Sequence, residues 1–343
     1  MSKPTIVDIA KFAGVSIGTV SNALNNKGRI SETTRKKVIA AAEELGFVPN
    51  YNASKLKSGK SNLIGVIVED ITNPYMSEQT VALEEVLAQK GYLPLLANTN
   101  DNVVSQRRLI EEMVGQGVAG IVLAPSNGTE VADMALIKAR KVPCVLSTRE
   151  LADLSFDFVG ADDYQGAKLV TKHLLDAGHR RIVKVGGRES VSTGRLRTKG
   201  FCDAFEEQGI SMATSRIISG DATRAFGKQI AQDLIQNPMF YTAIMCQNDI
   251  VAAGVYTALM KAGVKVGKDV AVTGFDGLKD TELWAPPLTT VRANPSAIGR
   301  DVGLHLLQRL EGDTSPVRRT RLMPELVIRQ STANMKINAD TNF

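Results

Sequence analysis

The chain has 343 residues, a formal net charge of +5 and 43% hydrophobic residues, which is typical of a soluble globular protein. No cationic leader and no apolar run long enough to cross a bilayer is found, so we expect a cytoplasmic location and no membrane partner. The three cysteines and three histidines show neither disulfide nor metal-ligand spacing, and neither a metal nor another cofactor is expected.

The positive charge is concentrated in the first 60 residues. They hold ten Lys/Arg against four Asp/Glu, a balance of +6, which leaves −1 of the total +5 for residues 61–343. A basic segment attached to a nearly neutral body indicates a head that binds a polyanion. An ordinary solvated basic surface is the alternative, and only motifs can decide between the two.

The basic head begins with two short helices joined by a tight turn. Thr5 is a suitable cap for a helix over 6–13, and Gly14 supplies the turn. Ser16 then caps a second helix over 17–24. A third helix follows Ser31, and the segment 1–48 is predicted to form one small all-α domain.

The second helix has an outer face with neither bulk nor charge, made of Ile17, Gly18, Ser21 and Asn22. A helix that enters the major groove of DNA, which is about 12 Å wide, must bring small side chains to the base edges. The sequence therefore predicts a helix-turn-helix that binds double-stranded DNA. A three-helix bundle without DNA-binding function is the alternative.

The stretch DIAKFAGVSIGTVSNALN, followed by RISETTRKKVIAAAEELGFVPNYNASKL, resembles the start of lactose/galactose repressor (LacI/GalR) family regulators. The resemblance continues more weakly to about residue 332. It implies that Ile17, Gly18 and Asn22 select the operator. It also implies a set that contacts the DNA backbone, namely Thr5, Ser16, Thr19, Ser21, Asn25, Arg29 and Ser31.

Residues 49–61 form the joint between head and body. In the resembled family a hinge helix here folds on operator DNA, and this resemblance implies DNA contacts for Asn50, Ala53 and Leu56. Leu56 would wedge between bases of the minor groove, and Ala53 would let two paired hinge helices approach. A flexible basic linker is the alternative.

From residue 62 onward apolar strand-like runs alternate with helical segments. A first series contains LIGVIVE, LPLLAN, VAGIVLAP and VPCVLST. A second series begins near residue 157 and contains FVGAD, RIVKVGG, TAIMCQN and VAVTGFD. This alternation predicts an α/β body with two doubly wound parallel sheets.

The resemblance implies a two-lobed body of the periplasmic-binding-protein type, in which the chain crosses between lobes near residues 160, 290 and 322. The expected effector-binding and dimerisation domain is 62–335, with the tail 336–343 beyond it. Its N-lobe comprises about 62–160 plus 288–321, and its C-lobe about 161–287 plus 322–335.

A homodimer is expected, because two heads are needed for two half-sites of a pseudo-palindromic operator. Trp284, the only tryptophan, stands where relatives have their dimer face, although a core position is the alternative. The tail shows no heptad repeat, so no tetramerising coiled coil is expected.

Ligands of parallel sheets bind at the carboxyl ends of the strands. The residues after the predicted strands are Asn73, Pro74, Ser126, Thr148, Arg149, the loop 188–197, Asn248 and Asp276. The resemblance implies that Arg197 and Asp276 grip an effector, supported by Thr193 and Asn248. The guanidinium fork and the carboxylate suit a polyol such as a sugar, while a structural salt bridge is the alternative.

Three departures from the family leave the effector open. Thr148 stands where many members have Asp, and Ala222 and Pro295 stand where well-known members have aromatic rings. A phosphorylated sugar held by Arg149 and Arg188, a nucleoside or purine, and no effector response are the alternatives to a sugar.

These features together predict a ligand-controlled transcriptional repressor and not an enzyme. No GxGxxG or GxSxG motif, paired carboxylates at a defined spacing, or histidine near a nucleophile is found in the sequence. A secreted sugar-binding protein would carry a leader and would not need a DNA-binding head.

Overall fold

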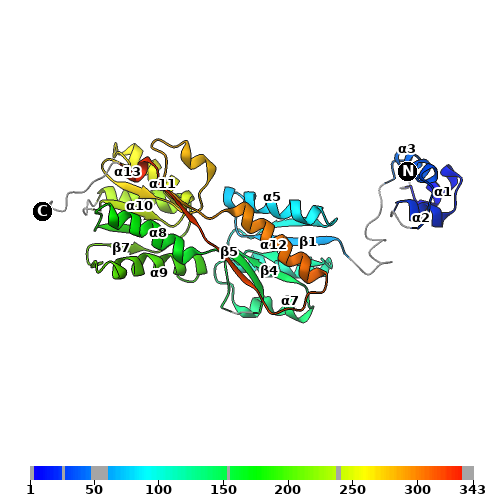
Figure 1. Cartoon of the computed structure of the whole chain (residues 1–343), viewed down its shortest axis with the longest axis horizontal. Coiled ribbons are helices and arrows are strands. Elements are labelled where there is room, and N and C mark those ends of the chain that lie inside the picture. The colour runs from blue at the N-terminus through cyan, green and yellow to red at the C-terminus, as the bar shows by residue number, and fades with distance from the viewer. Residues whose placement is uncertain (1–3, 25–27, 48–60, 153–154, 237–240, 334–343) are drawn as a thin grey trace. The chain divides into compact units, whose positions relative to one another are not determined.

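The computed structural model describes residues 4–24, 28–47, 61–152, 155–236 and 241–333. These residues belong to two compact units that divide between Lys60 and Ser61 (Figure 1). Most of the predicted hinge and all of the tail 336–343 lie outside the described residues. The predicted DNA contacts that also lie outside them are Asn25, Asn50, Ala53 and Leu56.

The first unit contains three helices, α1 (Ile6–Ala13), α2 (Ile17–Leu24) and α3 (Glu32–Glu44). The three predicted helices are thus confirmed. Local signals explain their bounds: Thr5 and Asp8 form a reciprocal capping box at the start of α1. Gly14 ends α1 with φ 60°, a conformation that glycine adopts without strain.

The head has its own small hydrophobic core. Ile9, Val20 and Val38, one from each helix, are fully buried and pack together. Arg35 of α3 donates from Nη1 to the carbonyl of Ala23 at 3.1 Å, which ties α3 to the last turn of α2. The position of α2 is therefore fixed by α1 and α3.

The first lobe of the second unit is built on a six-stranded parallel sheet in the order β11-β5-β4-β3-β1-β2. Its strands are β1 (Leu63–Val68), β2 (Leu93–Asn98), β3 (Gly120–Leu123), β4 (Cys144–Ser147), β5 (Asp157–Ala161) and β11 (Arg319–Leu322). Its helices are α5 (Pro74–Ala88), α6 (Val103–Gly115), η1 (Val131–Met134), α7 (Ala135–Ala139) and α12 (Pro295–Leu310).

The second lobe is built on a four-stranded parallel sheet in the order β7-β6-β8-β9. Its strands are β6 (Ile182–Val185), β7 (Arg216–Ile218), β8 (Ala243–Cys246) and β9 (Ala271–Thr273). Its helices are α8 (Asp163–Asp176), α9 (Ser192–Glu207), α10 (Arg224–Gln236), α11 (Asp249–Lys261), η2 (Lys279–Glu282) and α13 (Gln330–Ala333).

Helices cover both faces of the first sheet, which explains why its strands read as continuous apolar runs. Val66 of β1 shares a core cluster with Leu83 of α5 and Val302 of α12. The next residue, Ile67, belongs instead to the cluster with Ile110 of α6. No helix of the described residues has the length and apolar character needed to span a membrane.

The chain passes between the lobes three times (Figure 1). The first passage leads from β5 into α8, and the other two are made by β10 (Thr290–Arg292) and β12 (Glu325–Val327) with their flanking residues. These two strands pair antiparallel, with Val291 opposite Leu326. The predicted fold class, a helical head followed by two parallel α/β sheets, is confirmed.

One assignment from the sequence is wrong. The run FVGAD was placed at the start of the second series, but β5 is hydrogen-bonded between β4 and β11 in the first sheet. The apolar pattern of a strand shows that it is buried, and its partners are decided by contacts far away in the sequence. The short strands β7, β10, β11 and β12 were not identified.

Candidate functional site

The outer face of α2 is exposed, as the sequence predicts. Ile17 is 46% exposed, and Gly18 and Asn22 are exposed beside it. Val20 of the same helix is fully buried in the core of the head. The three residues predicted to select the operator therefore lie together on a surface that a major groove can reach.

Three of the predicted contacts to the DNA backbone, Thr5, Ser16 and Ser31, lie at helix N-termini. Thr19 N donates to Ser16 Oγ at 3.1 Å, and Thr34 N donates to Ser31 Oγ at 3.2 Å. Thr5 caps α1 in the same way. Helix N-termini carry partial positive charge and favour phosphate, and Arg29 is exposed on the same domain. The capping hydroxyls are thus placed where phosphates are attracted.

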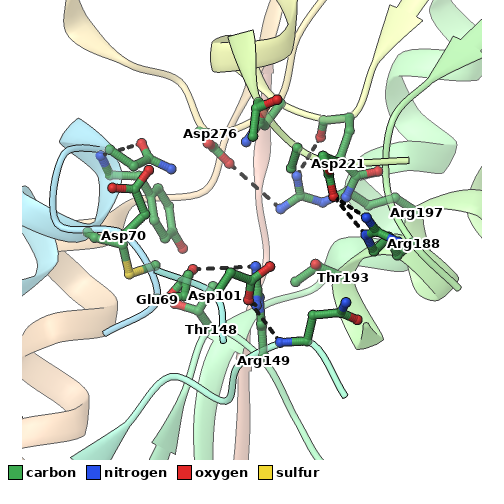
Figure 2. A pocket seen from close by; sticks show the side chains of 18 of the residues that line it. Glu69, Asp70, Asp101, Thr148, Arg149, Arg188, Thr193, Arg197, Asp221 and Asp276 are labelled. Atoms are coloured by element: carbon green, nitrogen blue, oxygen red, sulfur yellow. Dashed lines mark hydrogen bonds and ion pairs between the residues drawn. The ribbon is translucent and has the colours of Figure 1, made fainter. Parts of the chain in front are cut away.

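A cavity of about 350 Å³ lies between the two lobes (Figure 2). It opens at the carboxyl ends of strands from both sheets, where ligands of parallel sheets bind. Its wall is made of Glu69, Asp70, Asn73, Tyr75, Met76, Asn100, Asp101, Asn127, Thr148, Arg149, Arg188, Thr193, Arg197, Asp221, Ala222, Thr223, Gln247, Asn248 and Asp276.

The structure brings most of the predicted effector residues together in this wall. The members that line it are Asn73, Thr148, Arg149, Thr193, Arg197, Asn248 and Asp276. Arg197 is not in a loop, because α9 already begins at Ser192. Its guanidinium reaches the cavity from the second turn of that helix.

Two predicted effector residues are not part of the wall. Pro74 occupies the first turn of α5 behind its cap Asn73, where its missing N–H costs no hydrogen bond. Ser126 is 4% exposed, and its hydroxyl is bonded to Thr99 Oγ1 at 2.8 Å. Both residues were predicted as effector contacts because they follow predicted strands. Their local packing, however, keeps them out of the cavity wall.

Arg197 has structural partners as well as a place in the wall. Its Nε donates to Asp163 Oδ1 at 2.7 Å, and its Nη1 donates to the carbonyl of Gln247 at 2.6 Å. Nη2 lies 3.7 Å from Asp276 Oδ1, and the guanidinium stacks on Phe275, 3.5 Å from the ring centroid. The salt bridge that the sequence left as an alternative therefore exists, and it fixes the direction of the guanidinium.

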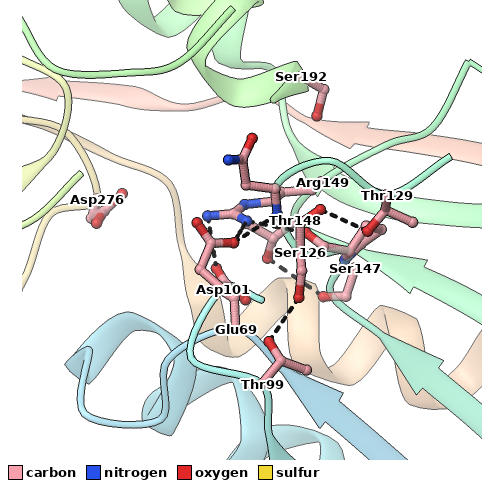
Figure 3. A network of polar contacts seen from close by, with 12 residues as sticks. Glu69, Thr99, Asp101, Ser126, Thr129, Ser147, Thr148, Arg149, Ser192 and Asp276 are labelled. Carbon is pink, nitrogen blue, oxygen red and sulfur yellow. Dashed lines mark hydrogen bonds and ion pairs between the residues drawn. The ribbon is translucent and has the colours of Figure 1, made fainter. Parts of the chain in front are cut away.

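The other two arginines of the wall are also paired. Arg149 donates from Nη1 to Asp101 Oδ1 at 2.5 Å, and its Nη2 lies 3.8 Å from Glu69 Oε1 (Figure 3). Arg188 Nη2 lies 2.6 Å from Asp221 Oδ1. Each guanidinium in the cavity thus already has a carboxylate partner from the chain.

Backbone strain is concentrated at the cavity. Among the described residues, six that are not glycine have positive φ, and four of them line it: Asn100, Asp101, Thr148 and Asp276. Thr148 at φ 62° is unusual, because a β-branched side chain disfavours this region. Strained residues of this kind gather at functional sites, where the surrounding structure holds them in place.

Burial raises the pKa of two acidic residues of the wall. Loss of water raises the pKa of Glu69, although the nearby Arg149 opposes this effect. Burial likewise raises the pKa of Asp276 well above its usual range, against the influence of Arg197. No group of three or more His, Cys, Asp or Glu side chains within the described ranges is arranged to hold a metal ion.

The sequence analysis missed several residues of the wall. Glu69 and Asp70 directly follow β1, Asn100 and Asp101 follow β2, and Gln247 follows β8. Reading every polar residue at each strand end would have found them. Asp221 was missed because β7, which precedes it, was not recognised as a strand.

Trp284 lies on the second lobe, away from this cavity. It is half-buried, and its ring packs against Tyr256 with 5.0 Å between centroids. The neighbouring Leu283 is 80% exposed and Met260 is 74% exposed. The predicted dimer contact therefore falls on a partly apolar surface.

Each of the two units matches a known protein family. Residues 5–50 match the bacterial regulatory proteins of the lacI family, and residues 61–330 match the periplasmic binding proteins and sugar binding domain of LacI family. The chain is 33% identical to the HTH-type transcriptional repressor PurR of Photobacterium profundum over 96% of this chain and 99% of that protein. It is also 33% identical to the HTH-type transcriptional regulator DegA of Bacillus subtilis, over 96% and 98%.

Solved structures agree with this placement. The lac repressor dimer bound to operator and the anti-inducer ONPF has a TM-score of 0.85 and 27% identity, covering 96% of this chain and 99% of that one. A LacI family regulator from Enterococcus faecium with bound ribose has a TM-score of 0.73 and 26% identity, covering 80% and 99%. The CelR–cellobiose complex has a TM-score of 0.71 and 26% identity, covering 96% and 99%. The chain therefore belongs to the lacI family of bacterial regulatory proteins and is a DNA-binding transcriptional regulator of the helix-turn-helix type.

Proposed function

We propose that this regulator is a cytoplasmic repressor whose operator binding is controlled by a hydroxyl-rich small metabolite, a sugar or sugar derivative. The observation that carries the effector proposal is the cavity between the lobes. Its wall joins oriented guanidinium and carboxylate groups from both sheets, and four of its residues are held in strained conformations.

The chemistry of the wall suits hydroxyl groups. A hydroxyl both donates and accepts, so it can bond to Asp276 as a donor and to a guanidinium such as that of Arg197 as an acceptor. Tyr75 and Met76 add apolar surface to the same wall. The bound ribose and cellobiose of two similar regulators support this ligand class.

On the DNA side, we assign operator selection to Ile17, Gly18 and Asn22, and minor-groove insertion to Leu56. Two heads bind two half-sites, so the active form is a homodimer with Trp284 at its interface. The support is the exposed face of α2 and the partly apolar surface around Trp284.

The effector acts through the relative positions of the lobes. Ser190 Oγ of the second lobe donates to Asn127 Oδ1 of the first at 2.7 Å, and Lys279 Nζ lies 3.2 Å from Glu78 Oε2. Contacts of this kind form only when the lobes are close. A ligand that binds the closed arrangement more tightly than the open one shifts the population toward it and changes operator affinity.

A thermal-shift panel of sugars, sugar phosphates and nucleosides on the full chain would identify the effector, since a ligand at a hundredfold its Kd adds about 2.7 kcal/mol. Calorimetry with that ligand should then show a loss of about 2–5 kcal/mol of binding for Asp276→Asn and for Arg197→Ala. Asp276→Asn is the cleaner change, because Arg197 also pairs with Asp163.

Arg108→Ala is the matched control, since within the described part of the chain this arginine is paired only with Glu112 on the exposed surface of α6. It should leave effector affinity unchanged. Wild-type affinity for both cavity variants would show that the effector binds elsewhere.

A further inference from the structure

The cavity wall has more acidic than basic side chains. Its carboxylates are Glu69, Asp70, Asp101, Asp221 and Asp276, and its guanidiniums are those of Arg149, Arg188 and Arg197. Since each guanidinium already has a carboxylate partner, a phosphate or carboxylate on a ligand would have to displace one of these partners. The wall is therefore unfavourable for an anionic ligand.

Glu69, like Asp276, has an arginine close by but beyond hydrogen-bond distance. The residue is 8% exposed, and its Oε2 is buried without a hydrogen-bond partner. Its nearest cation, Arg149 Nη2, lies 3.8 Å from Oε1, which is beyond hydrogen-bond distance. Figure 2 shows the side chain at the edge of the cavity, on the wall formed by the first lobe.

In the cluster around Glu69, acidic side chains outnumber basic ones. Arg149 is shared between Glu69 and Asp101, so two carboxylates face one guanidinium, and Asp70 adds a further negative charge beside them. A buried carboxylate without a full partner is costly, and it is stabilised by a cation or by a proton. A ligand hydroxyl can bond to the carboxylate but would leave it without a compensating charge.

A metal ion does not explain the cluster, because no metal-holding group of side chains is found among the described residues. An organic ammonium supplies both a positive charge and hydrogen-bond donors for the Glu69 carboxylate. Asp276 and Arg197, on the wall formed by the second lobe, remain available for hydroxyl groups of the same molecule (Figure 2).

The geometry points to an effector that carries a protonated amine beside its hydroxyl groups, an amino sugar or another polyhydroxylated amine, with Glu69 as the residue that binds the ammonium. This assignment rests on the proposed effector role of the cavity and specifies its ligand. Glu69 is then the residue that distinguishes amine-bearing ligands from neutral and phosphorylated ones.

Matched pairs of probes test the assignment on the full chain. Glucosamine is compared with glucose, galactosamine with galactose, and the Tris cation with pentaerythritol, whose fourth arm is a hydroxymethyl group in place of the ammonium. We expect at least one amine to raise the melting temperature where its neutral partner does not, and glucose 6-phosphate to have no effect. The affinity for that amine, measured by calorimetry, should fall at least tenfold in Glu69→Gln.

Two variants separate the charge of Glu69 from its packing. Glu69→Asp keeps the carboxylate and should retain the preference for the amine, whereas Glu69→Gln keeps the shape and should lose it. Glu112→Gln on the exposed surface of α6 should behave as the wild type.

The assignment is overturned if no amine exceeds its neutral partner, or if Glu69→Gln binds the amine as tightly as the wild type. If a neutral sugar binds and Asp276→Asn weakens it while the amine has no advantage, the proposed function stands and only the ammonium assignment fails. If ligand binding is insensitive to Glu69→Gln and to Asp276→Asn alike, both proposals fail.

Discussion

Asp157 shows how a single buried carboxylate holds the first lobe together. It is 3% exposed at the start of β5 and accepts hydrogen bonds from Arg309 Nε and Nη2 at 2.7 and 2.8 Å. The backbone N–H of Arg318 donates to it as well, at 2.8 Å. Burial alone would raise the pKa of Asp157, but these donors outweigh it, and the pKa lies below its ordinary value.

We expect Asp157→Asn to lower the free energy of unfolding by about 3 kcal/mol near neutral pH, because Arg309 would lose its counter-charge in a largely buried position. The folded pKa of Asp157 is lower than its ordinary value of 3.8, so its charge stabilises the fold above that value. This contribution is lost as the pH falls through the folded pKa. Urea unfolding along a descending pH series should show a constant difference from the wild type until about pH 4, and a shrinking one below.

Glu112→Gln is the control for the Asp157 experiment, since its pair with Arg108 is exposed and should contribute less than about 1 kcal/mol. A difference for Asp157→Asn that stays the same across the whole pH series would contradict the assignment of its charge.

At the scale of a single element, the start of α2 combines a structural and a functional role in one hydroxyl. Ser16 Oγ accepts from Thr19 N at 3.1 Å and so caps the helix. The same residue is one of the predicted contacts to the DNA backbone. Substitution can separate the two roles, because other residues cap a helix equally well.

Ser16→Asp should keep the cap, since aspartate is a good N-cap and its charge suits the positive end of a helix. The stability of the head should stay within about 0.5 kcal/mol, whereas operator affinity should fall at least tenfold because the carboxylate repels phosphate. Ser16→Ala should instead cost about 1 kcal/mol of head stability. Thermal unfolding and gel-shift titration measure the two effects.

Asn102→Asp is a matched control at the N-cap of α6 in the first lobe, where Asn102 accepts from Ser105 N at 3.0 Å. It adds the same charge at a helix N-terminus and should leave operator binding unchanged. If Ser16→Asp bound operator as the wild type does, Ser16 would have no place at the DNA surface.

At the scale of the whole molecule, charge is divided between the two units, with +6 in residues 1–60 and −1 in residues 61–343. Cations that neutralise phosphates release counterions from DNA, so operator affinity should fall steeply as salt rises. Arg29→Gln should lower the magnitude of the salt slope by about 0.9, the effect of one lost phosphate contact, without changing the preferred operator sequence.

Lys261→Gln, at the end of α11 in the second lobe, should leave the salt slope unchanged. Filter-binding titrations at several salt concentrations, combined with selection from random DNA, check both expectations. A salt slope near zero for the wild type would argue against the basic head as the DNA-binding surface.

Features that depend on neighbouring residues could be predicted from the sequence alone. The bounds of α1, α2 and α3 follow from caps within three residues of each helix start, at Thr5, Ser16 and Ser31, and from the turn at Gly14. The longer buried strands are visible as apolar runs, and the excess charge of the head can be counted directly.

Strand neighbours and charge pairs, in contrast, became known only from the folded structure. It places β5 beside β11, more than 150 residues later in the chain, and it joins Arg197 to Asp163 and Arg149 to Asp101 and Glu69. No local sequence pattern predicts these pairings. A strand buried on both faces has the same apolar composition at any inner position of a sheet, so its composition does not show which strands lie beside it. The same holds for the cavity wall. Each of its polar residues follows its own strand, but the folded arrangement of the sheets determines which of these residues meet.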